Sequence, residues 1–257
     1  MKLRFLASIV ALLLVATAAF ADSRATDAIR KARVAIGSES ALAALQSIHY
    51  KGTLQTTQKV PVDGDPNNLR EESVVLGIDI IFQKRFQQRM TLRSDRVVET
   101  TALNDYEAWV RQADAANETQ WQVTLLDSQQ VKRLRANTWE NLYFFAGIER
   151  RGGTVEYAGE ARSDDRDCVK LIFSHGENIV FTRFFDKSTG RLVKTVTESG
   201  GEIREEGELI VQGLRFPRKL LNKSADGQLA TITFESVTLN ERFPDDVFAV
   251  PTLRLAR

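Results

Sequence analysis

The chain has 257 residues, of which 43% are hydrophobic, and it carries 35 basic against 34 acidic side chains. A general nucleic-acid or anionic-membrane binder should show a basic excess, so we expect no nucleic acid partner. Only one cysteine is present, Cys168, so no internal disulfide can form and the hydrophobic core must hold the fold. Its strand-like surroundings favour a small buried residue over a reactive thiol.

The first 21 residues predict a secretory signal peptide. Residues 1–4 are basic, residues 5–15 form a short apolar run, and Ala19-Phe20-Ala21 fits a cleavage site before Asp22. That run is too short for a membrane span, no later stretch approaches about 20 apolar residues, and no cysteine adjoins the cleavage site. We therefore expect residues 22–257 to form one exported, soluble domain without a lipid anchor.

Residues 23–46 predict one or two short amphipathic helices. Their apolar residues recur at spacings of three and four on both sides of Gly37. Gly37 followed by Ser38 and Glu39 is typical of a helix stop at a C′ glycine and a restart at an N-cap serine.

From Ser47 the hydrophobic period changes to two, which indicates half-buried strands. Residues 61–68 (PVDGDPNN) interrupt this pattern and predict a loop. The connections between the runs are too short for parallel crossovers, so the sheet should be antiparallel. The first group of predicted strands covers residues 47–55, 74–82, 86–92, 97–103 and 106–110.

A helix is predicted within this series of strands. Between residues 119 and 145 apolar side chains follow three-and-four spacing, with basic residues on another face. We assign the helix to residues 124–145, with a break near Asp127-Ser128.

After Gly152-Gly153 the strand pattern returns and continues into a C-terminal meander. Asp226-Gly227 indicates a type I′ hairpin turn there, because both central positions of that turn need positive φ. The predicted strands cover residues 154–161, 168–173, 179–185, 192–198, 208–211, 216–222 and 228–239. The fold class is therefore α+β and mostly antiparallel β, with a single curved sheet of about 10–11 strands and helices packed against it.

The groups that an enzyme needs are scarce. His49 lies on the polar parity of its strand and His175 precedes a glycine, so both should be solvated, and neither has metal-ligand spacing. The acidic clusters at residues 164–167 and 205–208 are typical of solvated turns and faces. We expect no catalysis, no metal and no cofactor, and no shared cleft for these residues and Cys168.

Several strands are apolar on both parities, such as residues 74–82 and 179–185. A sheet with one face in water should alternate cleanly. The pattern is compatible with a closed core, which periodicity alone favours, or with an apolar concavity that holds a lipid chain.

The order of elements resembles the LolA/LolB-like lipoprotein localisation factors, and more closely their divergent relatives in Gram-negative bacteria, the outer-membrane lipoprotein-sorting proteins. The resemblance lies in the Ala-Leu-x-x-Leu-x-x-Ile segment 41–48, Tyr50-x-Gly52, the mid-sheet helix, and the ending Gly213-x-x-Phe216-Pro217 followed by Phe248-x-x-Pro251. These are turn and packing residues, so they indicate the fold more strongly than the function.

The resemblance implies an incomplete β-barrel with a helical lid, and an apolar cavity that carries acyl chains across the periplasm without catalysis. Lipid or lipoprotein acyl chains and envelope membrane proteins would be the partners of a periplasmic monomer. The alternative on the same fold is a protein-interaction or envelope-stress sensor module. The candidate cavity residues are Leu54, Ile78, Ile80, Phe82, Met90, Leu92, Trp139, Leu142, Tyr143 and Phe145.

The chain also departs from these carriers. The arginine that ties sheet to lid in them cannot be placed among Arg85, Arg89 and Arg93, and residues 60–69 look like an added loop.

Overall fold

A computed structural model describes residues 23–62, 65–176 and 178–252, so the predicted signal peptide lies outside the described residues. The described residues form two compact units. The smaller unit comprises residues 23–36 and 145–198, and the larger comprises 37–144 and 199–252. The assignment of the mature chain to one domain stays a prediction.

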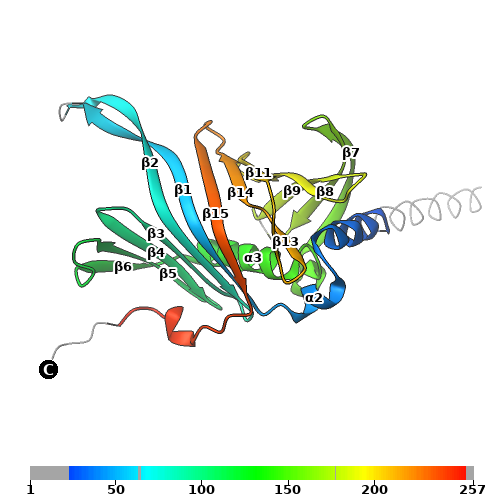
Figure 1. The fold of residues 1–257 in the computed structure, drawn as a ribbon, viewed down its shortest axis with the longest axis horizontal. Helices are drawn as coiled ribbons and strands as arrows, with labels where there is room; N and C mark the ends of the chain where they lie inside the picture. Colours follow the sequence, from blue (N-terminus) through cyan, green and yellow to red (C-terminus); the bar gives the residue numbers. More distant parts are fainter. Residues whose placement is uncertain (1–22, 63–64, 177, 253–257) are drawn as a thin grey trace, which may run out of the picture. The chain divides into compact units, whose positions relative to one another are not determined.

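The smaller unit packs an N-terminal helix, residues 23–36, against four antiparallel strands in the order β10-β9-β8-β7 (Figure 1). Ala25 and Ala32 of the helix join Leu171, Phe173 and Phe185 of the sheet in one buried cluster. The elements of this unit after the helix are η1 (Ile148–Arg151), β7 (Thr154–Ser163), β8 (Arg166–Ser174), β9 (Val180–Asp186) and β10 (Leu192–Thr197).

The larger unit carries nine strands in the order β6-β5-β4-β3-β2-β1-β15-β14-β11, and a separate β12-β13 pair. In chain order its elements are α2 (Glu39–Ala44), β1 (Ser47–Val62), β2 (Asp65–Gln83), β3 (Gln87–Arg93), β4 (Val97–Asn104), β5 (Glu107–Asp114), β6 (Trp121–Leu125), α3 (Ser128–Tyr143), β11 (Glu202–Glu206), β12 (Leu209–Val211), β13 (Leu214–Phe216), β14 (Lys219–Lys223), β15 (Leu229–Leu239) and η2 (Asp245–Val247).

The predicted fold class is confirmed. The described strands within each unit pair in antiparallel fashion, and β6 pairs with β5 alone, so the sheet is open rather than closed into a barrel. The described residues hold fifteen strands, more than the 10–11 predicted, and β6, β11 and β13 match none of the predicted strand ranges. The two helices predicted in residues 23–46 are both present, and the Ser38 side chain accepts from the backbone N–H of Ala41 as an N-cap.

The loop predicted at residues 61–68 is mostly strand. β1 continues to Val62 and β2 begins at Asp65, as parts of a long hairpin that extends past β3 (Figure 1), while residues 63–64 lie outside the described residues. Composition suggested a loop because proline, aspartate and asparagine are depleted in strands. Pro61, Asp65 and Asn68 are exposed, so little packing depends on their side chains.

The start of the inserted helix was also misplaced. Residues 121–125 form β6, and α3 begins only at Ser128. Trp121, Val123 and Leu125 have the period of two of a strand, a signal that the helical spacing of the longer window obscured.

Two glycines differ in the structure from what the sequence predicted for them. Asp226 has negative φ and only Gly227 is left-handed, at +90°, so the hairpin is a three-residue loop that ends in a bulge glycine rather than a type I′ turn. Gly37 does not have positive φ. A side chain there is excluded because its Cβ would lie 2.7 Å from the backbone oxygen of Gly213.

Candidate ligand-binding surface of the larger unit

Strand register divides the side chains of the larger unit between two faces of its sheet. Direct cross-strand neighbours share a face, and Tyr50, Ile80 and Met90 stand opposite one another on β1, β2 and β3. We call this the α3 face, and the opposite one, which carries His49, Ile81 and Arg89, the outer face. The apolar members of the α3 face that concern the site are Leu54, Leu76, Ile78, Ile80, Phe82, Met90, Leu92, Val110 and Ile232.

Helix α3 closes one end of the α3 face. The buried side-chain oxygen of Gln88 accepts hydrogen bonds from Asn137 and Thr138, at 3.1 and 3.2 Å. Beside this contact, Val131 packs against the buried Leu103 and Ala108 of β4 and β5.

The ends of α3 are fixed by local signals. The Asp127 side chain accepts from the backbone of Gln130, and the Gln130 side chain accepts from the backbone of Asp127, which forms a complete capping box. At the other end Phe144 adopts the left-handed conformation, and its N–H donates to the carbonyl of Glu140. These caps fix where α3 begins and ends.

The arginine that ties helix to sheet is Arg135 of α3. Its guanidinium donates to the backbone and side chain of Asp105, in the β4–β5 turn, and lies 4.1 Å from the Phe86 ring and 3.8 Å from the Tyr106 ring. Among the earlier candidates, Arg89 points to the outer face by register. Sequence reasoning missed Arg135 because it searched the sheet and not the helix.

Next to this closed end, an aromatic cluster surrounds Tyr50. The Tyr50 ring lies 6.3 Å from Phe82, 5.9 Å from Phe216 and 4.6 Å from Phe234 between centroids. Burial raises the pKa of the Tyr50 hydroxyl, and the charge of Glu205 adds to the shift. Gly52 allows β15 to approach, because a Cβ there would lie 2.0 Å from the Thr233 oxygen at a β-bulge. The Tyr50-x-Gly52 pattern therefore combines a buried aromatic ring with a close approach of β15, and both lie beside the closed end of the α3 face.

The predicted cavity residues divide by their place on this face. Ile78, Ile80 and Phe82 are buried, whereas Leu54, Met90 and Leu92 are only half-buried. Leu76 and Ile232, which were not among the predicted residues, are also half-buried on this face. Strand rise separates Leu76 from Phe82 by about 20 Å. We call the half-buried set the open end, and it forms a continuous apolar surface across β1, β2, β3 and β15.

Four candidates come from the helical segment. Trp139 and Leu142 are buried, and Tyr143 stacks on Trp139 with 3.7 Å between ring centroids. Phe145 belongs to the smaller unit, where it packs against Phe173 and Phe185.

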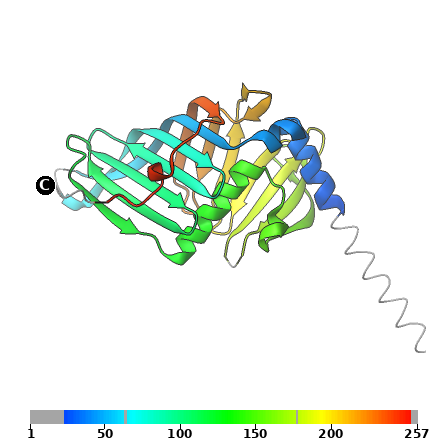
Figure 2. The same ribbon diagram turned by 90° about the horizontal axis from the view of Figure 1, so that it is seen from below.

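His49 lies on the outer face and is buried, whereas the sequence predicted a solvated side chain. Its Nδ1 lies 3.0 Å from Glu241 and its Nε2 lies 3.0 Å from Asp79, and its ring packs edge-on against Phe243. The parity was read correctly, but the sequence did not show which face of the sheet the C-terminal segment covers. The segment crosses the strands in Figure 2, and Phe248 accepts a hydrogen bond from the Trp109 indole.

The remaining reactive candidates, Cys168, His175 and the acidic pair Asp164 and Asp165, lie in the smaller unit. Cys168 is fully buried, and burial raises the pKa of its thiol, which makes it less reactive. His175 is half-buried with its ring edge-on to Phe181. The acidic pair Asp164 and Asp165 forms an exposed turn with positive φ at both residues, as its composition predicted.

The smaller unit also holds an open groove of about 950 Å³ between its N-terminal helix and β7–β9. Ala28, Tyr157, Val169 and Phe185 supply its apolar lining. Ion pairs occupy much of its charged rim, for example Lys187 with Glu160 at 2.7 Å. Sequence analysis did not identify this groove.

Comparisons with known proteins were made on sequence and on structure. No family model and no curated protein matches the sequence. Among solved structures, a LolA superfamily protein from Nitrosomonas europaea aligns with a TM-score of 0.56 and 13% identity, over 88% of this chain and 97% of that one. A DUF1329 family protein from Desulfovibrio piger aligns with a TM-score of 0.54 and 7% identity, over 87% and 96%.

Within the described part of the chain, no helix is both long and apolar enough to cross a membrane. At these identities the structural likeness establishes the fold, and it agrees with the resemblance that the sequence motifs indicated. The chain therefore has a LolA-like fold.

Proposed function

We propose that the protein is a non-enzymatic carrier or binder of lipid or lipoprotein acyl chains, and that the open end of the α3 face contacts the chain. The observation that supports this most is the half-buried apolar surface formed by Leu54, Leu76, Met90 and Leu92 on three neighbouring strands. The proposal includes a periplasmic, monomeric protein after removal of residues 1–21. The LolA-like fold supports it through the carrier function that the sequence resemblance implies.

The chemistry of the surface suits an acyl chain. Each methylene that leaves water contributes about 0.8 kcal/mol, so affinity needs a broad apolar contact and few polar groups. Ile78, Ile80 and Phe82 are buried and form the rigid part of this surface, because α3 and the aromatic cluster around Tyr50 hold the end that α3 closes. An acyl chain would remove the most apolar area from water at the open end, because the side chains there are still partly exposed.

Two pairs of neighbouring positions allow a matched test. Leu54 and Leu76 lie opposite each other on the α3 face, whereas their neighbours Gln55 and Val75 lie opposite each other on the outer face and are exposed. Leu54→Glu and Leu76→Glu place a charge against the proposed ligand, while Gln55→Glu and Val75→Glu place the same charge in water.

Binding of a fluorescent fatty acid is measured for all four variants after circular dichroism confirms folding. We expect the two α3-face variants to bind about tenfold more weakly or worse, because an unpaired charge would be desolvated, and the outer-face variants to match the wild type. Equal binding by all four would exclude the open end as the site. A folded wild type that binds no acyl probe would favour the protein-interaction module instead.

A further inference from the structure

Three arginines gather on the outer face of the larger unit, on both sides of β4. Arg89 and Arg93 flank Thr91 on β3, and the register runs from Thr91 through Thr100 to Arg111 on β5. The β4 side chains between them are small and buried: Val98, Thr100 and Ala102.

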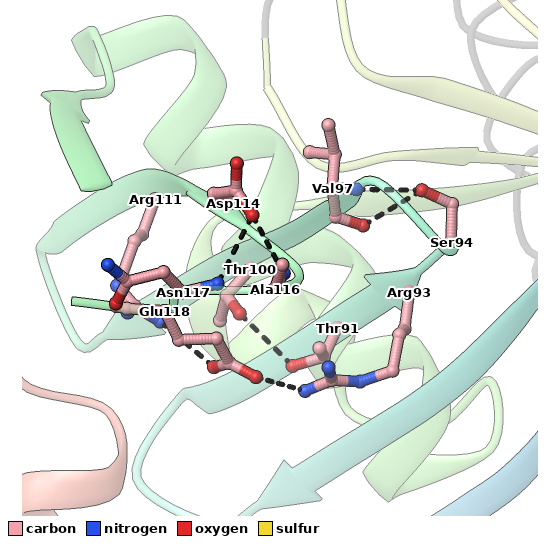
Figure 3. A network of polar contacts seen from close by, with 10 residues as sticks. All are labelled: Thr91, Arg93, Ser94, Val97, Thr100, Arg111, Asp114, Ala116, Asn117 and Glu118. Atoms are coloured by element: carbon pink, nitrogen blue, oxygen red, sulfur yellow. Dashed lines mark hydrogen bonds and ion pairs between the residues drawn. The ribbon is translucent and has the colours of Figure 1, made fainter. Parts of the chain in front are cut away.

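A single carboxylate from the β5–β6 loop lies among these arginines. Arg93 donates to Glu118 at 2.7 Å, and the Arg111 Nη1 lies 3.9 Å from the same carboxylate while its Nη2 donates to the Glu118 carbonyl at 2.6 Å (Figure 3). Asp114 holds the loop in place by accepting from the backbone N–H groups of Ala116 and Asn117 (Figure 3). The Glu118 side chain is 42% exposed, so it can move without disturbing a core.

The cluster has more positive than negative charge. Three guanidinium groups act on the one carboxylate, and the pKa of Glu118 is lowered chiefly by its hydrogen bond with Arg93, with further contributions from Arg111 and Arg89. Arg89 makes no hydrogen bond or ion pair within the described residues, and its Nε is buried without a partner. The nearest outer-face acid on β2, Asp79, is engaged with His49.

We propose that Arg89, Arg93 and Arg111 form a binding site for a phosphate group, and that Glu118 is the internal carboxylate that occupies it when no ligand is bound. Guanidinium groups match phosphate oxygens in paired hydrogen bonds. The two negative charges of a phosphate dianion balance three guanidinium groups better than the single charge of Glu118 does. The near-zero net charge of the whole chain hid this local excess from the sequence analysis. The phosphate could belong to a soluble ester or to an anionic lipid headgroup, and the site does not depend on acyl-chain binding at the α3 face.

The test removes the internal carboxylate. Glu118→Gln keeps the shape of the side chain but frees the arginines, and Glu107→Gln makes the same charge change at an exposed position at the start of β5. Binding is measured by calorimetry with inorganic phosphate, and by sedimentation with vesicles of phosphatidylglycerol or phosphatidylcholine, at one low ionic strength.

We expect Glu118→Gln to bind a phosphate probe about tenfold more tightly than the wild type, because a competing charge-assisted hydrogen bond is lost. Adding Arg89→Gln or Arg93→Gln should cancel the gain. A gain with inorganic phosphate identifies a soluble ligand, and a gain confined to phosphatidylglycerol vesicles identifies a headgroup. No gain with either probe, or an equal gain in Glu107→Gln, would overturn the proposal.

Discussion

The two faces of the larger unit's sheet are built from alternate residues of the same strands, yet they are covered in different ways. The α3 face is mostly apolar on β1, β2 and β3, whereas Glu99 of β4 and Gln112 of β5 are polar members of it. Helix α3 covers only one end of this face. The outer face is covered by the C-terminal segment through polar contacts, at His49 and at Trp109, and beyond that segment it presents arginines. One face therefore offers apolar surface and the other offers charge.

This difference shows how a single run of β-strands can carry two chemistries. A shift in register by one residue would exchange the two faces, so the features that fix register determine both. The bulge at Lys51/Gly52 is one of these features, because only glycine fits against Thr233 there. The comparison can be tested by changing each face separately.

The largest effect is expected from Tyr50→Ala on the α3 face. Removing a buried aromatic ring that contacts three others should lower the free energy of unfolding by about 4 kcal/mol, measured by urea denaturation. Gln55→Ala, exposed on the outer face of the same strand, should change it by less than about 0.5 kcal/mol. Similar losses in both variants would mean that the two faces do not differ as described.

A smaller effect is expected from His49→Ala on the outer face. The change removes two hydrogen-bonded contacts with Asp79 and Glu241 and should cost about 2 kcal/mol. Amide hydrogen exchange should also become faster at Phe248, because Glu241 anchors the start of the C-terminal segment. Lys51→Ala, exposed on the same face, is the control, and an unchanged exchange rate in His49→Ala would show that the segment is held elsewhere.

The smallest effect concerns pH and the arginine cluster. Because Arg93 and the neighbouring arginines lower the pKa of Glu118 from its ordinary value of 4.5, the ion pair stabilises the fold above that pH. Its contribution should disappear as pH falls through the lowered pKa. NMR titration of the Glu118 carboxyl should give a midpoint below 4.5 that rises in Arg93→Gln. A midpoint that Arg93→Gln does not move would contradict the contact.

Local patterns predicted much of this fold. The period of two in β1 and β2, the Gly37-Ser38 helix boundary and the LolA-like order of elements were all readable, because each depends on neighbouring residues. The errors arose where a distant contact or a short window decided the outcome. β11 was read as a solvated acidic face, since its pairing partner β14 is separated from it in sequence.

The candidate site was predictable only in part. Alternation identified Leu54, Ile80 and Met90 as members of one face, but it could not show which of them are buried. Arg135 and the arginine cluster were missed because their partners come together only through register and loop geometry. The burial of His49 likewise depends on a segment nearly 200 residues away.

The central claim, that acyl chains bind the open end of the α3 face, is tested most directly by photo-crosslinking. A photoreactive fatty acid is irradiated with the mature protein, and labelled residues are located by peptide mass spectrometry. We predict labels at Leu54, Leu76, Met90 or Leu92, reduced by excess unlabelled fatty acid and by Leu54→Glu. Saturable labelling confined to outer-face residues such as Val75, or no saturable labelling, would contradict the account.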